Sequence, residues 1–257
     1  MNNFNASEKS RGILALANNT SSIDYQGIAK KTLELASHHL GIPYKVISTP
    51  TPEHWINHRN DIDTQQQVAW LNHNRFQVYD LSPWDETIVI DADYLVTTDK
   101  LNLLFNSQSD LVFCHRNHML HDQSTYTAGL QPIWATVFFF RKSQRSQNFF
   151  ELVGRIQRNY SYYRQIFGIL QSNFRNDMAF AMAEKILHGY TLPEHTRMPW
   201  GITTVDAPVQ QININRDWMV VRTDHGADVL PRQDLHVQSK AWLQSPGFDQ
   251  FLLEARQ

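Results

Sequence analysis

Two aspartates one residue apart are the first candidates for chemistry in this sequence. Asp91 and Asp93 follow directly after the apolar run at residues 87–90, in the stretch ETIVIDADYLV. That run predicts a buried strand, and residues i and i+2 of a strand project to the same face. The two carboxylates therefore point the same way if the strand continues through them. They lie at the carboxyl end of the strand, where open α/β sheets bind ligands.

A divalent cation is the partner that two neighbouring carboxylates favour. Side by side, the carboxylates repel each other and both resist burial. Hard ions such as Mg²⁺ and Mn²⁺ bind carboxylate oxygens and keep positions open for substrate phosphates. The alternative is a pair of aspartates that cap the loop after the strand, because D-x-D alone is a short pattern. Both interpretations stay open on this pattern.

A second candidate group lies near the C-terminus. The stretch DLHVQSKAWL, residues 234–243, places His236 four residues before Lys240. A neutral imidazole can bind a metal, and an ammonium can hold a diphosphate as a point charge. A metal and a lysine together neutralise the charge that develops on a pyrophosphate leaving group. A structural role is the alternative for His236, since the chain has 12 histidines.

The elements that must position these residues alternate between strands and helices. Residues 12–18 predict a buried strand, Asp24 is expected to cap a helix that Gly41 ends, and residues 43–48 predict the next strand. A strand, a helix and a strand in this order form a βαβ unit, so the sheet should be parallel.

Further along the chain, the apolar spacing predicts more of both elements. Thr98 is expected to cap a helix that carries Leu101, Leu104 and Phe105. Other helices are expected at 63–71, at 147–168 and from Asn176 or Asp177 to Gly189, and other strands at 110–114, 136–140, 211–214 and 218–222. The fold class that follows is one α/β domain with a mixed sheet.

The composition of the chain excludes several classes of protein and of site. The 257 residues, 42% hydrophobic and 19% charged, are typical of a folded globular domain. No run approaches the roughly 18 apolar residues of a membrane span, so no membrane partner is expected. The single Cys114 excludes an internal disulfide and a cysteine zinc cluster. Residues 1–12 are polar and lack the apolar region of a secretory signal, so a cytoplasmic location is expected.

Charge is spread unevenly along the chain. Residues 141–175 contain seven basic residues and only one acidic residue, which gives the segment a charge of +6 in a chain of net charge -2. Such an asymmetry permits an anionic partner, and a solvated helix face is the alternative. Aromatic residues interleave with these arginines, and this combination is what nucleic-acid strands and flipped bases require. The alternative is that most of these aromatics lie on the core stripe of their own helix.

Four blocks of the sequence carry a resemblance to a known class of enzyme. LSPWDETIVIDADYLV, residues 81–96, resembles the D-x-D region of GT-A glycosyltransferases and is particularly similar to that of phage-encoded members. DLHVQSKAWL resembles the C-terminal His…Lys segment of glycogenin-like (family 8) relatives. FRNDMAFAMA, residues 174–183, resembles the block in which an acidic residue opens a helix beside the donor sugar, and ATVFFFRKS, residues 135–143, resembles the strand before it. The resemblance spans residues 12–243.

The resemblance implies a fold and a reaction. Residues 1–257 would form a single GT-A (Rossmann-like) domain with a mixed, mostly parallel sheet flanked by helices. The nucleotide-binding half would cover about residues 10–115, and the acceptor half with the metal and diphosphate segment about residues 116–245. The implied activity is hexosyl or pentosyl transfer from a nucleotide-diphospho-sugar to an acceptor hydroxyl, with Mn²⁺ or Mg²⁺ and with retention of configuration. The resemblance leaves the acceptor open. The basic segment at 141–175 would fit a hydroxylated base of phage DNA in the host cytoplasm, and a protein, a glycan or a small molecule are the alternatives.

Carried over residue by residue, the resemblance implies roles for the candidate residues. Asp93 would be the main metal ligand, Asp91 would contact the ribose or donor sugar and the metal, and His236 would complete the protein ligands. Lys240 would bind the diphosphate. Asp177 would lie near the anomeric carbon or hold sugar hydroxyls, with a helix N-cap as its alternative role.

The resemblance implies roles for three further residues, and two positions differ from the pattern of glycogenin-like enzymes. Asn18 and Thr20 would border the nucleotide base, and Arg75 would bind donor phosphates or lie on the surface. Trp134 stands where many glycogenin-like enzymes have Asn, and Ala241 stands where Pro is frequent after the lysine. Both departures bear on the identity of the donor.

Two other functions use the same residues. A haloacid-dehalogenase phosphohydrolase also places D-x-D after an apolar strand, with the first aspartate as nucleophile and Mg²⁺ beside it. In that class the motif opens the first strand, whereas here a βαβ unit precedes it. The other alternative is an inactive domain that binds nucleotide sugars, against which the presence of Asp91, Asp93, His236 and Lys240 argues.

Overall fold

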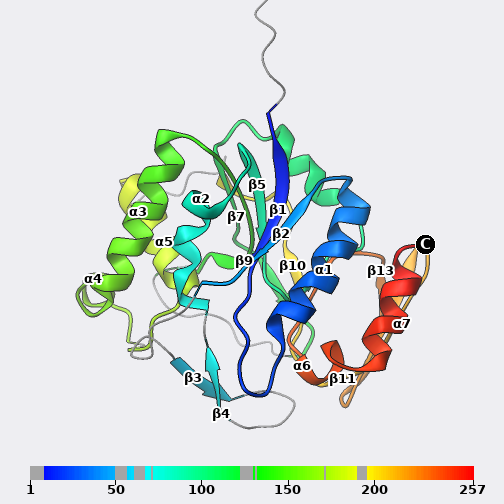
Figure 1. Ribbon diagram of the computed structural model, residues 1–257. Coiled ribbons are helices and arrows are strands. Elements are labelled where there is room, and N and C mark those ends of the chain that lie inside the picture. Colours follow the sequence, from blue (N-terminus) through cyan, green and yellow to red (C-terminus); the bar gives the residue numbers. More distant parts are fainter. Residues whose placement is uncertain are drawn as a thin grey trace, which may run out of the picture.

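The central feature of the computed structural model is a five-stranded sheet between layers of helices (Figure 1). The structure describes residues 9–49, 57–60, 67–70, 72–121, 130, 132–170, 172–189 and 196–257. The strand order of the sheet is β2 (Tyr44–Ile47), β1 (Arg11–Leu16), β5 (Glu86–Ile90), β9 (Trp134–Arg141) and β7 (Leu111–Cys114).

Four strands of this sheet run in one direction and β9 runs against them. β1 is parallel to both neighbours, with Ile13 opposite Tyr44 and Leu14 opposite Val89. β9 is antiparallel to β5 and to β7. The expected mixed, mostly parallel sheet flanked by helices is therefore confirmed, and the carboxyl ends of β1 and β5 meet at one edge.

The sheet is buried on both faces because its strands are apolar at successive positions. Ile13 and Ala15 pack into the core under α1 (Tyr25–Leu40) and the 3₁₀ helix η3 (Lys100–Asn106). Leu14 and Leu16 point to the opposite core, under α2 (Val78–Leu81), α3 (Gln144–Arg158) and α5 (Asn176–Leu187). Figure 1 shows α3 and α1 on opposite sides of the strands. A parallel strand between two helical layers reads as an unbroken apolar run, which is the pattern of β1.

Aromatic side chains dominate the core beneath α3 and α5. Phe138 of β9 lies 5.2 Å from the ring of Phe180, and Phe113 of β7 lies 4.8 Å from the ring of Phe149. All four rings are at most 1% exposed. Each such side chain contributes about 1.5–3 kcal/mol by its burial, so this cluster fixes α3 and α5 on the sheet.

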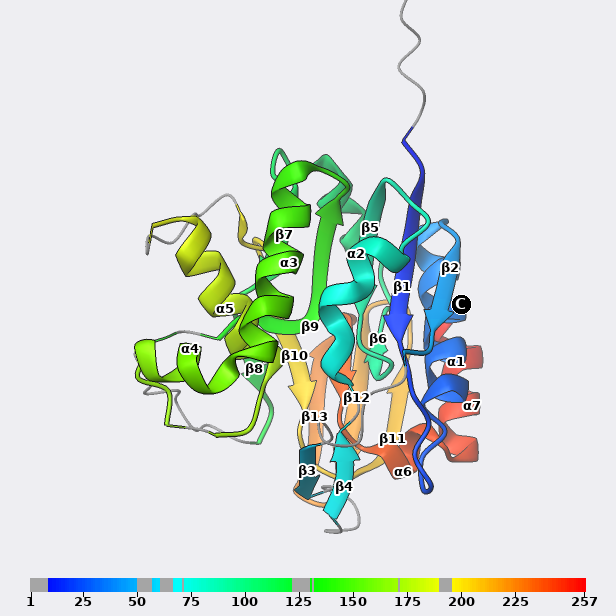
Figure 2. The same ribbon diagram turned by 60° about the vertical axis from the view of Figure 1, so that its left-hand side comes forward.

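Two smaller sheets follow along the chain. The strands of one are ordered β6 (Tyr94–Leu95), β14 (Leu235–Val237), β10 (Ile202–Val205) and β8 (Asn117–Met119). The other is an antiparallel meander of β11 (Val209–Ile214), β12 (Trp218–Thr223) and β13 (Gly226–Pro231). Helices α6 (Lys240–Leu243) and α7 (Pro246–Ala255) pack with this meander, and Figure 2 shows them at the end of the molecule that holds the smaller sheets.

Local sequence signals placed several boundaries correctly. Asp24 caps α1 by accepting a hydrogen bond from the backbone N–H of Gly27, and Gly41 ends the helix at φ 66°. Gly189, at φ 61°, follows α5. These are the positions at which an aspartate and a left-handed glycine satisfy groups that a helix end leaves unpaired.

Three expected helices differ in the structure. Residues 67–70 form strand β4 (Gln67–Trp70), which pairs with β3 (Asn57–Asn60), and the rest of the expected helix at 63–71 lies outside the described residues. The helix after Thr98 is the 3₁₀ helix η3, and its N-cap is Asp99. The expected helix at 147–168 is two helices, α3 and α4 (Tyr160–Ile166), because Asn159 caps α3 through its own backbone and side chain.

In the part of the chain that the structure describes, no helix combines the length and the apolar character needed to cross a bilayer.

Candidate metal and diphosphate site

The D-x-D stretch is a turn rather than the continuation of a strand. β5 ends at Ile90, and residues 92–93 turn before β6 begins at Tyr94. The expectation that Asp91 and Asp93 share a face because the strand continues is therefore wrong. The turn closes through a hydrogen bond from the N–H of Tyr94 to the carbonyl of Asp91, at 3.1 Å.

Neighbouring elements hold the backbone of this turn from three sides. The N–H of Asp91 donates to the carbonyl of Thr136 on β9, at 2.8 Å. The hydroxyl of Thr32 on α1 donates to the carbonyl of Ala92, and the N–H of Val237 on β14 donates to the carbonyl of Asp93. The turn is thus fixed between the central sheet and the second sheet, and its carboxylates are presented at the edge where β1 and β5 end.

The turn and β14 together form a potential metal site. Asp91, Asp93 and His236 each offer one ligand atom, and these atoms lie within 4.8 Å of one another. Asp93 and His236 are buried, while Asp91 is partly exposed. Two carboxylate oxygens and one imidazole nitrogen fit a borderline-hard divalent cation, and Mn²⁺ matches this mixed set better than Ca²⁺ does.

Lys240 supplies a positive charge at the same place. It is the first residue of α6, it is only 4% exposed, and its Nζ forms an ion pair with Oδ2 of Asp93. His236 Nε2 lies 3.4 Å from Oδ1 of the same carboxylate. Burial raises the pKa of Asp93, but Lys240 and His236 outweigh that effect and hold it well below the usual range of an aspartate. The ionised form of Asp93, which is the form that binds a cation, is therefore favoured.

Arg75 lies in the interior beside the first aspartate. Its Nη2 forms an ion pair with Oδ1 of Asp91, and its Nη1 donates to the carbonyl of Ala135. Arg75 is 3% exposed, so the alternative of a surface position for it is wrong. It comes from the 3₁₀ helix η2 (Asn72–Gln77), which leads into α2.

Asp177 lies outside the metal cluster but is linked to it through one backbone unit. Its Oδ1 accepts a hydrogen bond from the N–H of Ala135 at 3.1 Å, and its Oδ2 accepts one from Arg175 at 2.8 Å. Because the carbonyl of Ala135 binds Arg75, the chain of contacts continues to Asp91. The alternative role of Asp177 as a helix N-cap is wrong, since Arg175 occupies the N-cap of α5.

Asn18 and Thr20 follow β1 at the same edge as the aspartates. Asn18 Nδ2 donates to the carbonyl of Thr49 at 2.7 Å, and the hydroxyl of Ser48 donates to Asn18 Oδ1. The hydroxyl of Thr20 accepts from the N–H of Ile23 at 3.0 Å. Both side chains thereby shape the loop between β1 and α1.

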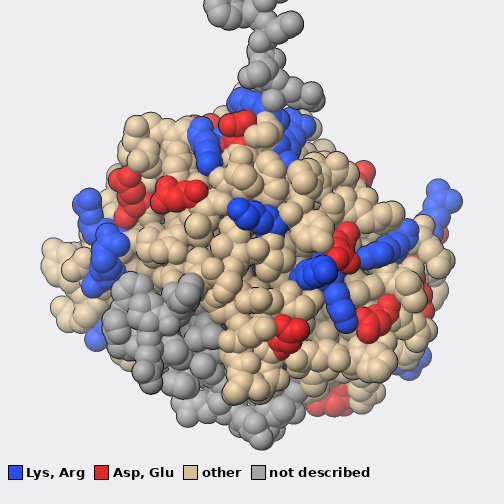
Figure 3. All heavy atoms as spheres, viewed as in Figure 1, with Lys and Arg blue, Asp and Glu red and all other residues tan. Residues whose placement is uncertain are grey.

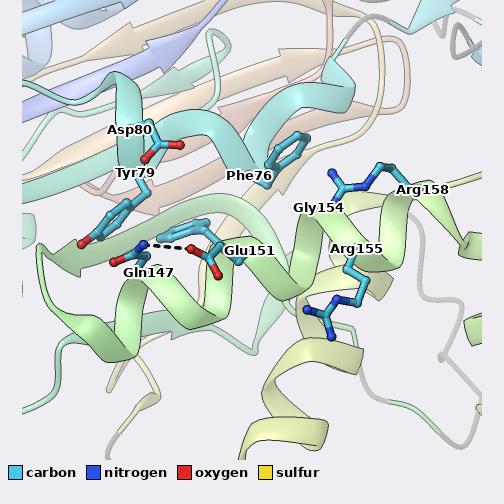
Figure 4. Close-up of a pocket in the computed structure, with 9 residues that line it drawn as sticks. Phe76, Tyr79, Asp80, Gln147, Glu151, Gly154, Arg155 and Arg158 are labelled. Atoms are coloured by element: carbon cyan, nitrogen blue, oxygen red, sulfur yellow. Dashed lines mark hydrogen bonds between the residues drawn. The ribbon is translucent and has the colours of Figure 1, made fainter.

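A cavity of about 320 Å³ lies between η2–α2 and α3 (Figure 4). Phe76, the residue after Arg75, lines it from one side. Asp80 and Glu151 lie toward one end, and Arg155 and Arg158 toward the other. None of the metal-site residues Asp91, Asp93 and His236 lines the cavity, which offers an apolar wall between opposite charges.

Most basic side chains of residues 141–175 make hydrogen bonds within the protein. Five of the seven cationic side chains bind other groups of the protein: Arg141, Lys142, Arg145, Arg164 and Arg175. Arg155 and Arg158 are exposed, and basic side chains gather over the α3–α4 edge of the face in Figure 3. The basic character of the segment is thus concentrated at one end of α3.

Most aromatic residues of the same segment belong to the core. Phe149, Phe150, Tyr160 and Phe174 are all at most 8% exposed. Of the two interpretations of these aromatics, stacking on nucleic-acid bases is therefore wrong for these four, and the alternative, a place in the core, is confirmed for them. Tyr162, at 63% exposure, reaches the surface, and Tyr163 and Phe167 are partly exposed.

Two polar residues linked to His236, Thr204 and Asn117, could not be recognised as site residues from any motif in the sequence. The hydroxyl of Thr204 on β10 lies 3.2 Å from His236 Nδ1 and donates to Oδ1 of Asn117 on β8 at 2.7 Å. Thr204 is 32 residues from His236 and 87 residues from Asn117 in the sequence, so only the pairing of the strands brings the three side chains together. No periodicity in a single sequence encodes such a contact.

Comparison with solved structures gives matches, whereas comparison with family models and curated sequences gives none. No protein-family model matches the chain, and no curated protein matches its sequence. Among solved structures, the glycosyltransferase GlyE of Streptococcus pneumoniae TIGR4 matches with a TM-score of 0.41 and 13% identity, over 75% of this chain and 46% of that chain. This chain therefore spans less than half the length of GlyE.

Two further matches are of similar strength. A glycosyltransferase involved in the glycosylation of the major capsid of PBCV-1 has a TM-score of 0.37 and 16% identity, over 76% of this chain and 80% of that chain. An active-site variant of LgtC has a TM-score of 0.44 and 16% identity, over 66% of this chain and 69% of that chain. At these TM-scores the function of this chain has to be argued from its own site.

Proposed function

We propose that this protein is a metal-dependent glycosyltransferase that moves a sugar from a nucleotide-diphospho-sugar to an acceptor hydroxyl. The observation that carries the proposal is the convergence of Asp91, Asp93 and His236 within 4.8 Å, with Lys240 bound to Asp93. The convergence lies where the carboxyl ends of β1 and β5 meet, which is where α/β sheets bind nucleotides.

The proposed roles follow from the chemistry of each group. Asp91, Asp93 and His236 hold Mn²⁺ or Mg²⁺, which neutralises charge on the diphosphate when it is bound. Lys240 moves its ammonium from Asp93 to a diphosphate oxygen, and this exchange replaces one ion pair by another. Both interactions stabilise the nucleoside diphosphate as it leaves.

The other candidate residues surround this centre. Asn18 and Thr20 border the base at the end of β1. Arg75 holds Asp91 in place through their ion pair and is the candidate to bind a donor phosphate. Asp177, joined to Arg75 through Ala135, lies on the side of the donor sugar, where it binds sugar hydroxyls or the region of the anomeric carbon.

The first test is donor turnover by the purified protein. We expect that incubation with Mn²⁺ and a panel of nucleotide sugars releases nucleoside diphosphate from one donor, as detected by mass spectrometry. Asp93→Asn should reduce this release at least 100-fold, because it removes the charge of a buried ligand. Asp99→Asn is the matched control, since Asp99 is exposed and its side chain makes no capping hydrogen bond.

The same experiment separates the alternative functions. Release of phosphate from phosphomonoesters, with no turnover of any donor, would identify a phosphohydrolase of the haloacid dehalogenase type. Binding of a donor without turnover in the presence of acceptors would identify an inactive nucleotide-sugar-binding domain. Wild-type transfer by Asp93→Asn would exclude the proposed metal site.

The stereochemistry proposed is retention, on the similarity of the His…Lys segment to glycogenin-like enzymes. In the donor the anomeric proton has a characteristic coupling constant, and a retained product keeps the same anomeric configuration. Proton NMR spectra recorded early in the reaction distinguish the two outcomes. An inverted first product would contradict retention and leave the transferase assignment intact.

The acceptor we propose is a hydroxylated base in DNA, bound through the exposed arginines at the end of α3. Arg155 and Arg158 support it, because they are the cations of residues 141–175 for which the structure describes exposed side chains without a structural hydrogen bond. Changing both to Gln should weaken single-stranded DNA binding and lower the salt slope by about 0.7 per lost phosphate contact. Arg145→Gln, which removes a charge bound to His188, is the control. Salt-independent binding by the wild type would exclude a nucleic-acid acceptor.

A further inference from the structure

The cavity between η2–α2 and α3 carries opposite charges at its two ends (Figure 4). Asp80 and Glu151 line one end, Arg155 and Arg158 line the other, and all four side chains are exposed to solvent. Glu151 and Arg155 are four residues apart in α3, the spacing of a helical ion pair, but Glu151 instead accepts a hydrogen bond from Gln147 at 2.8 Å. The two ends therefore each present their charge to a ligand.

Aromatic side chains form the wall between the charges. Phe76 lies between the two ends in Figure 4, and Tyr79 and Phe150 also line the cavity. The hydroxyl of Tyr79 donates to the carbonyl of Ser143 at 3.2 Å, and its ring lies 6.1 Å from that of Phe150. These contacts hold the wall in place, and a wall of aromatic rings suits a flat ligand.

Gly154 lets the Phe76 ring pack closely on α3. A β-carbon at this position would lie 2.9 Å from Cδ2 of Phe76, which is closer than side chains normally approach. Glycine inside a helix is less stable than alanine. Helix α3 thus has a less stable residue at the point where the wall of the cavity meets it.

We infer that the cavity holds one nucleotide of a single DNA strand, with the phosphate at the arginines, the base against Phe76 and an amino group of the base at the carboxylates. The inference rests on the proposed DNA acceptor and specifies how the strand is bound. An anion, a flat ring and a hydrogen-bond donor follow one another in a nucleotide in the order that the cavity requires. The volume of about 320 Å³ lies at the lower end of the range for ligand sites, roughly 300–1,000 Å³.

The two carboxylates predict which bases fit. An ionised carboxylate can only accept hydrogen bonds, and cytosine, adenine and guanine each have an amino group that donates. Thymine has a single N–H between two carbonyl oxygens, and these oxygens repel a carboxylate. The cavity should therefore prefer amino-bearing bases to thymine.

The nucleotide in the cavity is not the one that receives the sugar. The cavity lining does not include the proposed ligands Asp91, Asp93 and His236. The bound nucleotide is thus a neighbour of the reacting one in the same strand, and its base sets the sequence context that is modified. Phe76 directly follows Arg75 in η2, which links the cavity to the ion pair with Asp91.

The first measurement is the binding of free nucleotides in the presence of a metal chelator. By NMR, deoxycytidine monophosphate should shift the ring signals of Phe76, which Phe76→Leu identifies. It should also bind roughly fivefold or more tightly than thymidine monophosphate, the lower end of the discrimination by a good base contact. Equal binding of the two nucleotides by the wild type, or unchanged Phe76 signals, would overturn the inference.

Removal of the two carboxylates tests the origin of this preference. Asp80→Asn combined with Glu151→Gln should abolish the preference for deoxycytidine monophosphate while the Tm stays close to that of the wild type. Glu254→Gln is the matched control, because Gln250 donates to Glu254 of α7 at 3.0 Å in the same arrangement. A preference that survives in the double variant would show that the carboxylates do not contact the base.

The second measurement is the binding of short oligodeoxycytidine and oligothymidine strands, followed by fluorescence anisotropy. Arg155→Gln combined with Arg158→Gln should weaken both strands by the same factor, because phosphate contacts carry no sequence information. Arg216→Gln, at an exposed position between β11 and β12, is the control. A strand that binds no more tightly than the free nucleotide would overturn the assignment to a strand.

Gly154→Ala tests the shape of the cavity without changing a charge. The added methyl group displaces the Phe76 ring from α3, so deoxycytidine monophosphate should bind several-fold more weakly. The higher helix propensity of alanine favours a folded α3, which circular dichroism checks. Undiminished binding by the folded variant would contradict the placement of the base against Phe76.

These measurements need neither the metal nor a sugar donor, which keeps the inference separate from the transferase activity. If the nucleotides bind as expected but no nucleotide sugar is turned over, the cavity assignment holds and the transferase assignment fails. If a sugar is transferred but the cavity binds no nucleotide, the inference fails and the transferase assignment holds.

Discussion

At the scale of single residues, Lys240 and a metal ion compete for one carboxylate. Oδ2 of Asp93 is bound to the buried Lys240 ammonium, and Oδ1 of the same carboxylate faces His236. The positive charge keeps the buried carboxylate ionised, and it also opposes the arrival of a second positive charge. A diphosphate removes the conflict, since its negative charge attracts the ammonium away from Asp93. The cation and the nucleotide should therefore bind cooperatively.

Replacing Lys240 by Met should have opposite effects on the two ligands. We expect the variant to bind Mn²⁺ alone several-fold more tightly, because the competing charge is gone, and to bind nucleoside diphosphate at least tenfold more weakly. Calorimetric titration with each ligand checks both effects. Removing one partner of a buried pair costs roughly 3–5 kcal/mol, so the Tm of the metal-free variant should fall and recover with Mn²⁺. Weaker binding of both ligands would contradict the competition.

The site residues that the sequence could indicate were those with a chemical signature of their own. The spacing of Asp91 and Asp93 after an apolar strand, and of His236 before Lys240, pointed to the residues that the structure brings together. The reason given for the convergence of the aspartates was wrong, since a turn rather than a strand presents them. Arg75, Thr204 and Asn117 act through partners that are distant in sequence, so their positions depended on the fold.

At the scale of elements, strand β5 is anchored at the end opposite to the aspartates. Glu86, its first residue, is 2% exposed and binds Arg11 of β1 at 2.9 Å and Arg141 of β9 at 2.7 Å. Burial raises the pKa of Glu86, but the two arginines outweigh it and hold that pKa below its usual value. One carboxylate thus ties three adjacent strands together, and the strand that carries the D-x-D turn cannot slide relative to its neighbours.

Glu86→Gln should destabilise the protein far more than the loss of an exposed ion pair does. Removing one partner of a buried charge cluster costs roughly 3 kcal/mol, whereas an exposed pair contributes about 0–1 kcal/mol. The comparison is Lys31→Met, which breaks the exposed pair of Lys31 and Asp249. Urea unfolding should show a lower midpoint for Glu86→Gln with an unchanged slope. Similar midpoints for the two variants would show that the Glu86 cluster does not stabilise the sheet.

The elements that the sequence predicted best were those with strong local signals. Asp24 and Gly41 delimit α1, and the apolar runs of β1, β5 and β9 identify strands that are buried on both faces. The expectation at 63–71 failed because polar residues without a clear period do not distinguish a helix from the strand at 67–70. The break at Asn159 was missed because the apolar stripe continues from α3 into α4.

At the scale of the whole molecule, a buried network joins the core under α5 to the loop after β7. Glu184 of α5 binds His115 at 3.2 Å and the hydroxyl of Thr196 at 2.6 Å, and its side chain is 2% exposed. Burial raises the pKa of Glu184, but these hydrogen bonds outweigh the effect and hold the pKa below its ordinary value of 4.5. Folding therefore favours the charged form of this group.

The sign of the resulting pH dependence follows from that lowered pKa. The ionised Glu184 contributes its full stability above about pH 4.5, and the contribution is lost as the pH falls through the lower pKa of the folded state. Glu184→Gln should be less stable by about 1–3 kcal/mol at pH 7, with a difference from the wild type that shrinks below pH 4.5. Thermal unfolding between pH 3 and pH 7 checks this, with the exposed Glu151→Gln as control. A difference that stays constant with pH would exclude the ionised state as the cause.

The long separation between Asp93 and Lys240 has a consequence during synthesis of the chain. The two are 147 residues apart, yet their ion pair is buried in the finished protein. At about 5–20 residues per second, a ribosome needs roughly 7–30 s to add the lysine after the aspartate. For nearly all of that time the growing chain also lacks His236, the third proposed ligand. The complete set of proposed ligands therefore comes together only after β14 has been made and has paired with β6.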